Sequence, residues 1–310
     1  MANSKLPKPA TPRRPDPRAV LFFLFIIVFG VALTLYSTRA LKATANFNGQ
    51  SAFAHAEAQM AYGPRTPGSQ AHEQTRSYIA DTLERYGWTP EQPDGELLGQ
   101  PVHNILATWP GSEDAPWIIL GAHYDSRFFA DHDPEPANHS QPVQGANDGA
   151  SGVAVLLELA RVLPLNNPDA TVTLAFFDAE DNGSIEGWDW IMGSRLMADS
   201  LAELPDAVII LDMIGDADLQ IYLERNSDPR LAAEIWAQAA ELGYADIFIN
   251  DPKHTMLDDH TPFLAREIPA VDIIDFDYPY WHTVQDTLDK ISPRSLGVVG
   301  EVVLAWVLAQ

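Results

Sequence analysis

The longest apolar stretch of the chain lies near its N-terminus. Residues 19–38 (AVLFFLFIIVFGVALTLYST) are uncharged and mostly apolar. As a helix rising 1.5 Å per residue they match the roughly 30 Å hydrocarbon core of a bilayer. The segment before this stretch is basic, with five cations against the single acid Asp16: Lys5, Lys8, Arg13, Arg14 and Arg18. Because excess cations favour the cytoplasmic side, we predict a cytoplasmic segment over 1–18, a transmembrane anchor over 19–38 and an extracytoplasmic domain over 39–310.

A cleaved signal peptide is the alternative interpretation of this N-terminus. Ala43-Thr44-Ala45 offers a small-x-small cleavage site. Signal h-regions, however, run only about 7–15 residues. Arg39 and Lys42 also stand between the apolar stretch and that site. We therefore expect a single-pass membrane protein, with secretion after cleavage as the alternative; in both cases the catalytic domain is exported.

Short apolar runs alternate with helical patterns along the rest of the chain. The runs are typical of buried strands and lie at 117–120, 171–177, 208–211 and 270–274. Apolar residues at helical spacing lie at 152–163, 231–242 and 295–308. This alternation predicts a single α/β domain with a central mixed, mostly parallel sheet flanked by helices.

Acidic residues and histidines follow the predicted strands. The first run leads into His123 and the second into Glu180-Asp181; Asp212 ends the third, and His282 follows the fourth. Ligands in open α/β sheets collect at the carboxyl ends of the strands. The sequence therefore places its candidate chemistry at one edge of the sheet.

These side chains supply what a hydrolytic zinc site needs. The chain has no cysteine, so a metal site must use His, Asp and Glu. His123, Asp148, Asp181, Asp212 and His282 form a possible ligand set, and Asp148 lies in a Gly-rich turn before a helix. Adjacent residues on a strand point in different directions, so Asp181 can bind metal while the preceding glutamate stays free as a general base.

Seven segments of the sequence, in order, resemble the zinc aminopeptidase family that also contains the glutaminyl cyclases. They are RTPGS at 65–69, GAHYDS at 121–126, GANDGASG at 145–152, FFDAED at 176–181, GSR at 193–195, DDHTPFL at 258–264 and YWHT at 280–283. Each alone is a weak signal, but the seven together make a specific match. The resemblance covers nearly all of residues 60–310 and implies a zinc-exopeptidase-like fold.

The resemblance implies roles that depend on the branch of the family. In the aminopeptidases Asp148 would bridge two zinc ions, with His123 and Asp212 completing one site and Asp181 and His282 the other. In the cyclases a single zinc would be held by Asp148, Asp181 and His282. The free glutamate, Glu180, would activate water in the first branch. In the second it would relay a proton while an N-terminal glutamine cyclises and releases ammonia.

We expect the cyclase branch, with a metallo-aminopeptidase as the alternative. Trp281 before the predicted ligand histidine and the segment around Asp259 resemble the cyclases, whereas DGASG at 148–152 resembles the aminopeptidases. The predicted catalytic residues are Glu180, Asp212 and Asp259. The predicted metal ligands are Asp148, Asp181, His282 and His123. The predicted substrate-binding residues are Trp281 and Trp188. Trp190 competes with Trp188 for its place. Asp181 departs from the family, which has a glutamate there, so its carboxylate reaches less far.

Charge limits the partners that we expect. The whole chain carries a net charge of −24, but residues 1–42 are basic and residues 43–310 hold 12 basic and 42 acidic side chains, a balance of −30. A field of this sign attracts cationic peptide N-termini and repels nucleic acid. The basic N-terminal segment suits anionic lipid headgroups.

Two other classes of protein fit the sequence less well. A catalytically inactive ectodomain of the same fold would have no reason to keep the full set of metal-ligand and base residues. A calcium-binding surface protein would need Asp-rich loops at regular spacing, which the sequence lacks.

Overall fold

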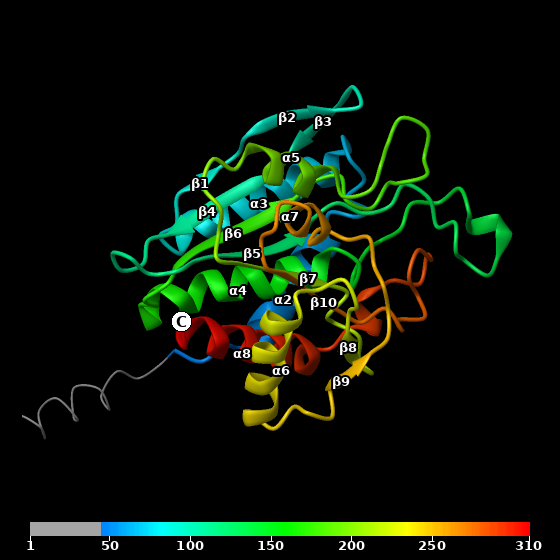
Figure 1. The fold of residues 1–310 in the computed structure, drawn as a ribbon. Coiled ribbons are helices and arrows are strands. Elements are labelled where there is room, and N and C mark those ends of the chain that lie inside the picture. The colour runs from blue at the N-terminus through cyan, green and yellow to red at the C-terminus, as the bar shows by residue number, and fades with distance from the viewer. Residues whose placement is uncertain (1–44) are drawn as a thin grey trace, which may run out of the picture. The chain divides into compact units, whose positions relative to one another are not determined.

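A six-stranded sheet forms the centre of the fold in the computed structural model, which describes residues 45–310 (Figure 1). In spatial order its strands are β1 (Pro90–Glu91), β4 (Ile105–Trp109), β6 (Thr171–Phe177), β5 (Trp117–His123), β7 (Ala207–Asp212) and β10 (Ala270–Ile274). The four strands from β6 to β10 run parallel, and β4 and β1 are antiparallel to their neighbours. The carboxyl ends of the parallel strands therefore share one edge.

The parallel strands are apolar throughout because both faces of the sheet are covered. In β5, Ile118 and Leu120 point into a large hydrophobic cluster, whereas Ile119 points into a second cluster on the opposite face. All three side chains are buried. This two-sided burial explains why these strands appear in the sequence as continuous apolar runs and not as an alternating pattern.

Helices cover the two faces unequally (Figure 1). The large cluster joins the sheet to α2 (Gly49–Met60), α3 (Gln70–Arg85), α4 (Ala150–Asn166), α6 (Pro229–Glu241) and α8 (Pro293–Leu308). The smaller cluster joins it to α5 (Met192–Ser200) and α7 (Thr261–Leu264). Helices α2, α4 and α8 also contact one another. The fold is thus a three-layered α/β unit.

Short elements lie outside the main sheet. A hairpin pairs β2 (Asp94–Leu97) with β3 (Gln100–His103), and β8 (Ile221–Leu223) runs parallel to β9 (Phe248–Pro252). Two 3₁₀ turns, η1 (Pro136–Asn138) and η2 (Leu288–Lys290), interrupt long loops. Over the range 45–310, no helix is both long and apolar enough to cross a membrane.

The predicted α/β domain with a mixed, mostly parallel sheet is confirmed. The four predicted strands correspond to β5, β6, β7 and β10, and the three predicted helices to α4, α6 and α8. The predicted cytoplasmic segment (1–18) and transmembrane anchor (19–38) lie outside the described residues.

Candidate functional site

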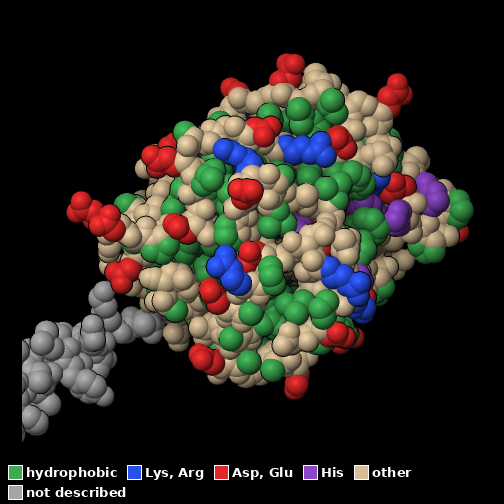
Figure 2. All heavy atoms as spheres, in the orientation of Figure 1, with side chains coloured by type: hydrophobic (Ala, Val, Ile, Leu, Met, Phe, Trp, Pro, Cys, Tyr) green, Lys and Arg blue, Asp and Glu red, His purple; other side chains and the backbone are tan. Residues whose placement is uncertain are grey.

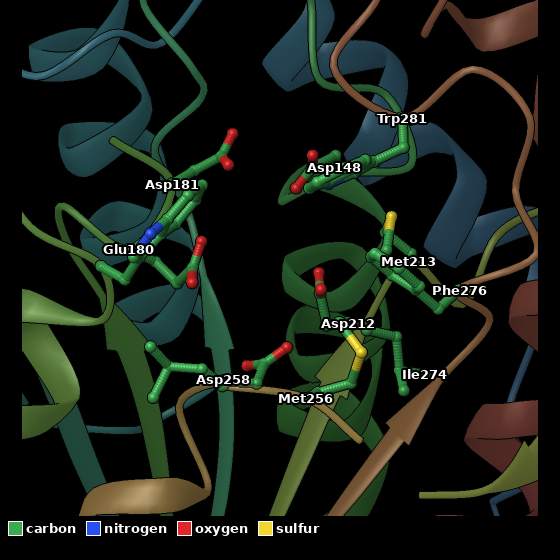
Figure 3. Close-up of a pocket in the computed structure, with 12 residues that line it drawn as sticks. Asp148, Glu180, Asp181, Asp212, Met213, Met256, Asp258, Ile274, Phe276 and Trp281 are labelled. Atoms are coloured by element: carbon green, nitrogen blue, oxygen red, sulfur yellow. The ribbon is translucent and has the colours of Figure 1, made fainter. Parts of the chain in front are cut away.

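A cavity of about 180 Å³ opens at the carboxyl ends of the parallel strands. Five carboxyl groups surround it (Figure 3): Asp148, Glu180, Asp181, Asp212 and Asp258. The rest of the lining is apolar: Trp190, Met213, Met256, Leu257, Ile274, Phe276 and Trp281. The sequence predicted the first four carboxyl groups at this edge, and the structure brings them together.

The turn before α4 fixes the position of Asp148. Gly149, which follows it, has a φ of 94°, and a Cβ there would lie 2.7 Å from the carbonyl oxygen of Asp125. Only glycine fits such a position without strain. The fully buried Arg65 lies behind the turn and donates to the carbonyl oxygens of Gly145 (2.6 Å) and Gln144 (2.8 Å). Arg65, the first residue of the RTPGS segment, therefore holds the glycine-rich turn in place.

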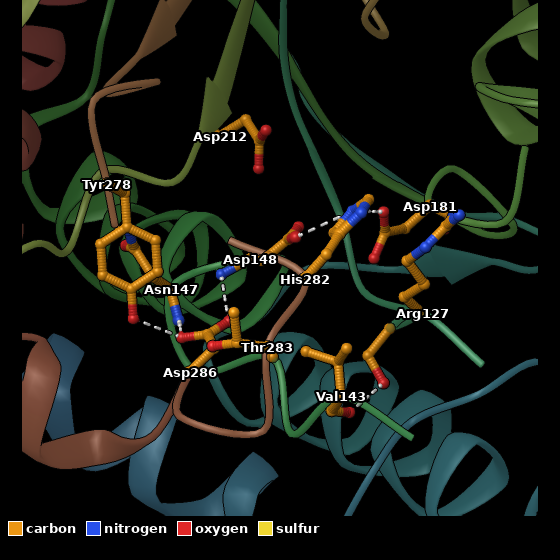
Figure 4. Close-up of polar contacts among 12 residues, drawn as sticks. Arg127, Val143, Asn147, Asp148, Asp181, Asp212, Tyr278, His282, Thr283 and Asp286 are labelled. Carbon is orange, nitrogen blue, oxygen red and sulfur yellow. Dashed lines mark hydrogen bonds and ion pairs between the residues drawn. The ribbon is translucent and has the colours of Figure 1, made fainter. Parts of the chain in front are cut away.

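Asp286 also anchors this turn (Figure 4). Its carboxylate accepts hydrogen bonds from the backbone N–H groups of Asn147 (2.8 Å) and Asp148 (3.1 Å) and from the hydroxyl of Tyr278 (2.7 Å). Burial, followed by the nearby charge of Asp148, raises the pKa of Asp286 to about 7. Sequence reasoning missed Asp286 because it lies 138 residues from the backbone that it holds.

Two groups of metal-ligating side chains share Asp148. In the first, Nε2 of His123 lies 3.1 Å from Oδ1 of Asp148 and 3.2 Å from Oδ1 of Asp212. In the second, Nε2 of His282 lies 2.7 Å from Oδ1 of Asp181 and 3.7 Å from Oδ2 of Asp148. All of the predicted ligands are therefore assembled, in the two sets that the aminopeptidase branch implied.

The donor set fits zinc. Oδ2 of Asp148 and Oδ2 of Asp181 are buried and have no hydrogen-bond donor within the described part of the chain. Imidazole and carboxylate are the ligands that zinc takes when cysteine is absent. Several carboxylates buried together are also costly unless cations or protons balance them. Asp148, Asp181 and His282 would hold one ion, and His123, Asp148 and Asp212 offer a place for a second.

The acid pair is held by one buried carboxylate. Asp125 accepts from the backbone N–H groups of Glu180 (3.0 Å) and Asp181 (3.3 Å) and from the side-chain amide of Asn182 (3.0 Å). Its Oδ1 also lies 3.4 Å from Nδ1 of His123. With the backbone fixed in this way, Asp181 points to His282 while Glu180 lines the cavity.

Burial is the largest influence on the pKa values of the acidic side chains around the cavity. It raises the pKa of Glu180 well above its usual value, with the neighbouring charges of Asp181 and Asp258 acting in the same direction. Burial also raises the pKa of Asp212 to about 8. Asp148 behaves differently: burial opposes its ionisation, but the hydrogen bond from His123 brings its pKa below the usual value. The pKa of the shared ligand Asp148 is thus lowered by its histidine partner, whereas burial raises the pKa values of Glu180 and Asp212.

Two indole rings flank His282, and they include Trp190 rather than the predicted Trp188. The ring of Trp281 stacks on His282 with centroids 3.8 Å apart, and the ring of Trp190 lies nearly parallel to it at 6.0 Å. Trp281 and Trp190 both line the cavity. Trp188 packs against Phe128 and is not part of the lining. The two candidates are two residues apart in an irregular loop, so sequence spacing could not distinguish them.

The structure places Asp258, and not the predicted Asp259, in the cavity. Asp258 lines the cavity near Glu180 and Asp212 (Figure 3). Asp259 is fully buried and absent from the lining, and burial raises its pKa well above its usual value. The Asp-Asp pair in the sequence indicated which segment contributes to the site. It did not indicate which of the two aspartates faces the cavity.

A second polar cluster lies behind Asp258. Nε2 of His260 lies 3.3 Å from Oε2 of Glu224, and its Nδ1 lies 3.9 Å from Oδ2 of Asp272; all three are buried. Glu224 also accepts from the backbone of Ser227 at 2.7 Å and of Met256 at 2.8 Å.

Three site-bearing loops contain non-glycine residues with positive φ. Ala179 before the acid pair has a φ of 55°, Met213 after Asp212 has 46°, and His282 has 55°. Such conformations cost free energy, and they persist only where the surrounding structure enforces them. Their position in the loops that follow β6, β7 and β10 indicates that the backbone is held in place for the side chains around the cavity.

The chain is similar in sequence to known proteins. The model of peptidase family M28 matches residues 104–307. Glutaminyl-peptide cyclotransferase of Drosophila melanogaster is 28% identical over 270 residues, which cover 74% of this chain and 72% of that protein.

Solved structures show the same fold. The glutaminyl cyclase of Tannerella forsythia superposes with a TM-score of 0.80 at 34% identity, covering 86% of this chain and 100% of that chain. A Zn-dependent exopeptidase from Parabacteroides distasonis superposes with a TM-score of 0.81 at 32% identity and the same coverage.

Proposed function

The chain belongs to peptidase family M28, and from this premise we propose that it is a zinc-dependent glutaminyl-peptide cyclotransferase. The observation that carries the proposal is the cavity: it is small, walled by indole rings, and bears Glu180 and Asp258 beside the metal-ligating groups. The names of the cyclase relatives support the same reaction.

The reaction needs one proton moved over a short distance. The α-amine of an N-terminal glutamine attacks its own side-chain amide carbon, so a C–N bond forms, the original C–NH₂ bond breaks, and ammonia leaves. Glu180 would accept the proton from the amine and deliver it to the departing nitrogen. Burial raises the pKa of Glu180 well above its usual value, which strengthens its affinity for the proton that it takes from the amine.

Other residues would bind and orient the substrate. Trp281, Trp190 and Phe276 offer apolar surfaces to the methylene groups of the glutamine side chain. Asp258 lies on the same side of the cavity as Glu180 and would accept a hydrogen bond from the substrate amine or amide. Zinc held by Asp148, Asp181 and His282 would supply Lewis-acid polarisation of the amide carbonyl.

A metallo-aminopeptidase is the second candidate, because the second donor set is complete. Nε2 of His123 lies 3.1 Å from Asp148 and 3.2 Å from Asp212, so the three side chains converge as those of the first set do. With two ions bound, Glu180 would act as general base for water, and the product would be a free N-terminal residue.

Metal content and product identity together test the proposal. We expect one zinc per chain by elemental analysis, and formation of pyroglutamate and ammonia from a Gln-initiated peptide by mass spectrometry. The same peptide with an acetylated N-terminus is the matched control, and it should not react because its nitrogen is no longer nucleophilic. Two zinc ions and release of free N-terminal residues would instead establish the aminopeptidase.

The change Glu180→Gln tests the proposed proton carrier. It keeps the shape of the side chain but removes its basicity, so we expect kcat to fall by about 10²–10⁴-fold. Zinc content should stay unchanged, because Asp181 and not Glu180 faces His282. A variant that loses its zinc would assign Glu180 to metal binding instead.

A further inference from the structure

The second ring nitrogen of His282 has no assigned partner. The imidazole is buried, and its Nε2 faces Asp181 and Asp148. Nδ1 is also buried and, over residues 45–310, has no hydrogen-bond partner. The oxygen Oδ1 of Asp131 lies 3.6 Å from it. This separation exceeds the usual donor–acceptor distance of a hydrogen bond by less than about 1 Å.

Arg127 fixes the position of this carboxylate. Its Nε donates to Oδ1 of Asp131 at 2.8 Å and its Nη2 to Oδ2 at 2.6 Å. Two parallel bonds of this kind set the orientation of a carboxylate as well as its position. Asp131 is therefore held with Oδ1 between the guanidinium group and the imidazole of His282.

The same guanidinium group contacts two other parts of the site. Nη1 of Arg127 donates to the carbonyl oxygens of Asp181 (2.8 Å) and Gly183 (3.3 Å), and Cζ lies 5.0 Å from the centre of the Trp190 ring. Arg127 itself is 3% exposed. One buried cation thus connects the acid-pair loop, the cavity wall and, through Asp131, the ligand histidine.

The other candidate ligand histidine has a parallel arrangement. Nδ1 of His123 lies 3.4 Å from Oδ1 of Asp125 while its Nε2 faces the shared acids. Both orienting carboxylates come from the segment after β5. Histidines that bind metal commonly donate their other N–H to a carboxylate, which fixes the tautomer and raises the basicity of the ligand nitrogen.

We propose that Asp131, held by Arg127, is a positioning residue for His282 that accepts its Nδ1–H and keeps Nε2 free to face Asp148 and Asp181. The proposal rests on the zinc centre of the proposed function but not on the reaction catalysed there. Asp131 and His132 also cluster with His282 as a possible ligand set of their own. Arg127 already engages both oxygens of Asp131, so a further cation has little charge left to balance.

Zinc affinity, measured by competition with a chelating dye, tests the proposal without any assay of activity. For Asp131→Asn and Asp131→Ala we expect affinity 10–100-fold below that of the parent protein. Glu73→Gln is the matched control: Glu73 is also half-exposed and paired with an arginine, Arg76 at 2.9 Å, but lies on α3 away from the cavity. Its zinc affinity should equal that of the parent.

A second measurement separates positioning from general loss of structure. In zinc-loaded protein with ¹⁵N-labelled histidine, the Nδ1–H signal of His282 should be protected from solvent exchange in the parent. In Asp131→Ala it should shift and exchange rapidly, while the melting temperature of the metal-free variant stays near that of Glu73→Gln.

The possible outcomes distinguish the positioning role of Asp131 from the proposed cyclotransferase reaction. Unchanged affinity together with an unchanged Nδ1–H signal in Asp131→Ala would overturn the positioning role. A parent protein that binds zinc but forms no pyroglutamate would overturn the proposed reaction and leave the positioning role to be decided by affinity. A parent that binds no zinc would overturn both.

Discussion

Asp258 and Asp259 are neighbours in the chain but lie in different environments, and their substitution should separate catalysis from packing. Asp258 lines the cavity beside Glu180, whereas Asp259 is enclosed by the fold. Burial, followed by the charge of Asp258, raises the pKa of Asp259 well above its usual value, and an asparagine resembles the Asp259 side chain in shape.

We therefore expect Asp258→Asn to lower kcat on a Gln-initiated peptide by about 10²-fold or more, because the carboxylate near the reacting groups is lost. Asp259→Asn should change kcat by less than about 3-fold, since no contact with substrate is removed. Steady-state kinetics of the two variants, with melting temperatures as a check on folding, provide the measurement. Equal losses of kcat would contradict the assignment.

The sequence predicted residue types at the site better than it predicted individual residues. His123, Asp181 and Asp212 lie at or just after strands that are buried and strongly patterned, so the topology placed them at the sheet edge. Asp148 lies in the turn before α4, and its role as a shared ligand was predicted from the resemblance to the zinc aminopeptidase family. Asp259 and Trp188 lie in loops, where a shift of one or two positions reverses which side chain faces the cavity. Arg127 and Asp286 act through contacts between loops, and such contacts leave no periodic signal in the sequence.

At the scale of elements, the packing of α4 on the sheet depends on a glycine. A Cβ at Gly152 would lie 2.1 Å from the carbonyl oxygen of Leu211 and 2.8 Å from the Cβ of Ala122. Leu211 precedes the ligand candidate Asp212 at the end of β7. The helix that carries Asp148 at its start is therefore in direct contact with the strand that carries Asp212.

Gly152→Ala should consequently destabilise the protein by at least about 1–3 kcal/mol, because helix and strand must move apart. Gly297→Ala in α8 is the matched control, since its Cβ would meet nothing closer than 3.6 Å. Alanine there should be neutral or stabilise the helix by about 0.5–1 kcal/mol. Urea unfolding of both variants gives the comparison, and a Gly152→Ala protein as stable as the parent would show that the contact can relax.

The sequence predicted the strands that are buried on both faces, but it missed some of the helices. Strands β5, β6, β7 and β10 are enclosed on both faces, so their apolar runs were visible in the sequence. Helix α2 has the sequence GQSAFAHAEAQM, in which alanine and polar residues give no apolar stripe, and it was not predicted. It packs closely on α4 and α8 through these small side chains, which is a tertiary property.

For the whole molecule, the charge of −30 over residues 43–310 has two parts. Figure 2 shows acidic side chains spread over the visible face with few basic ones between them. A smaller number are buried around the cavity and behind it, where they are available to metal and protons. The surface acids would attract a cationic peptide N-terminus toward the cavity. The predicted membrane anchor and extracytoplasmic location, which depend on residues 1–38, stay a prediction.

The buried acids make the stability of the whole fold depend on pH. Burial raises the pKa of Asp181 to about 6, of Asp275 and Asp286 to about 7 and of Asp212 to about 8. In the unfolded chain these groups ionise near pH 4. Between about pH 4 and pH 8 the folded state therefore binds more protons than the unfolded state. This contribution to stability is complete below pH 4 and is lost as the pH rises through 6 to 8.

We expect the metal-free protein to melt at a lower temperature at pH 8.5 than at pH 6.5, in calorimetry with a chelator present. Zinc should reverse the trend: it replaces the proton on Asp181, so the rise in melting temperature on adding zinc should be larger at pH 8.5. Asp275→Asn is the matched variant, because Asp275 lies outside both ligand sets, and it should reduce the pH dependence of the metal-free protein without changing the effect of zinc. A metal-free protein that is more stable at pH 8.5 would show that the buried acids are ionised in the folded state.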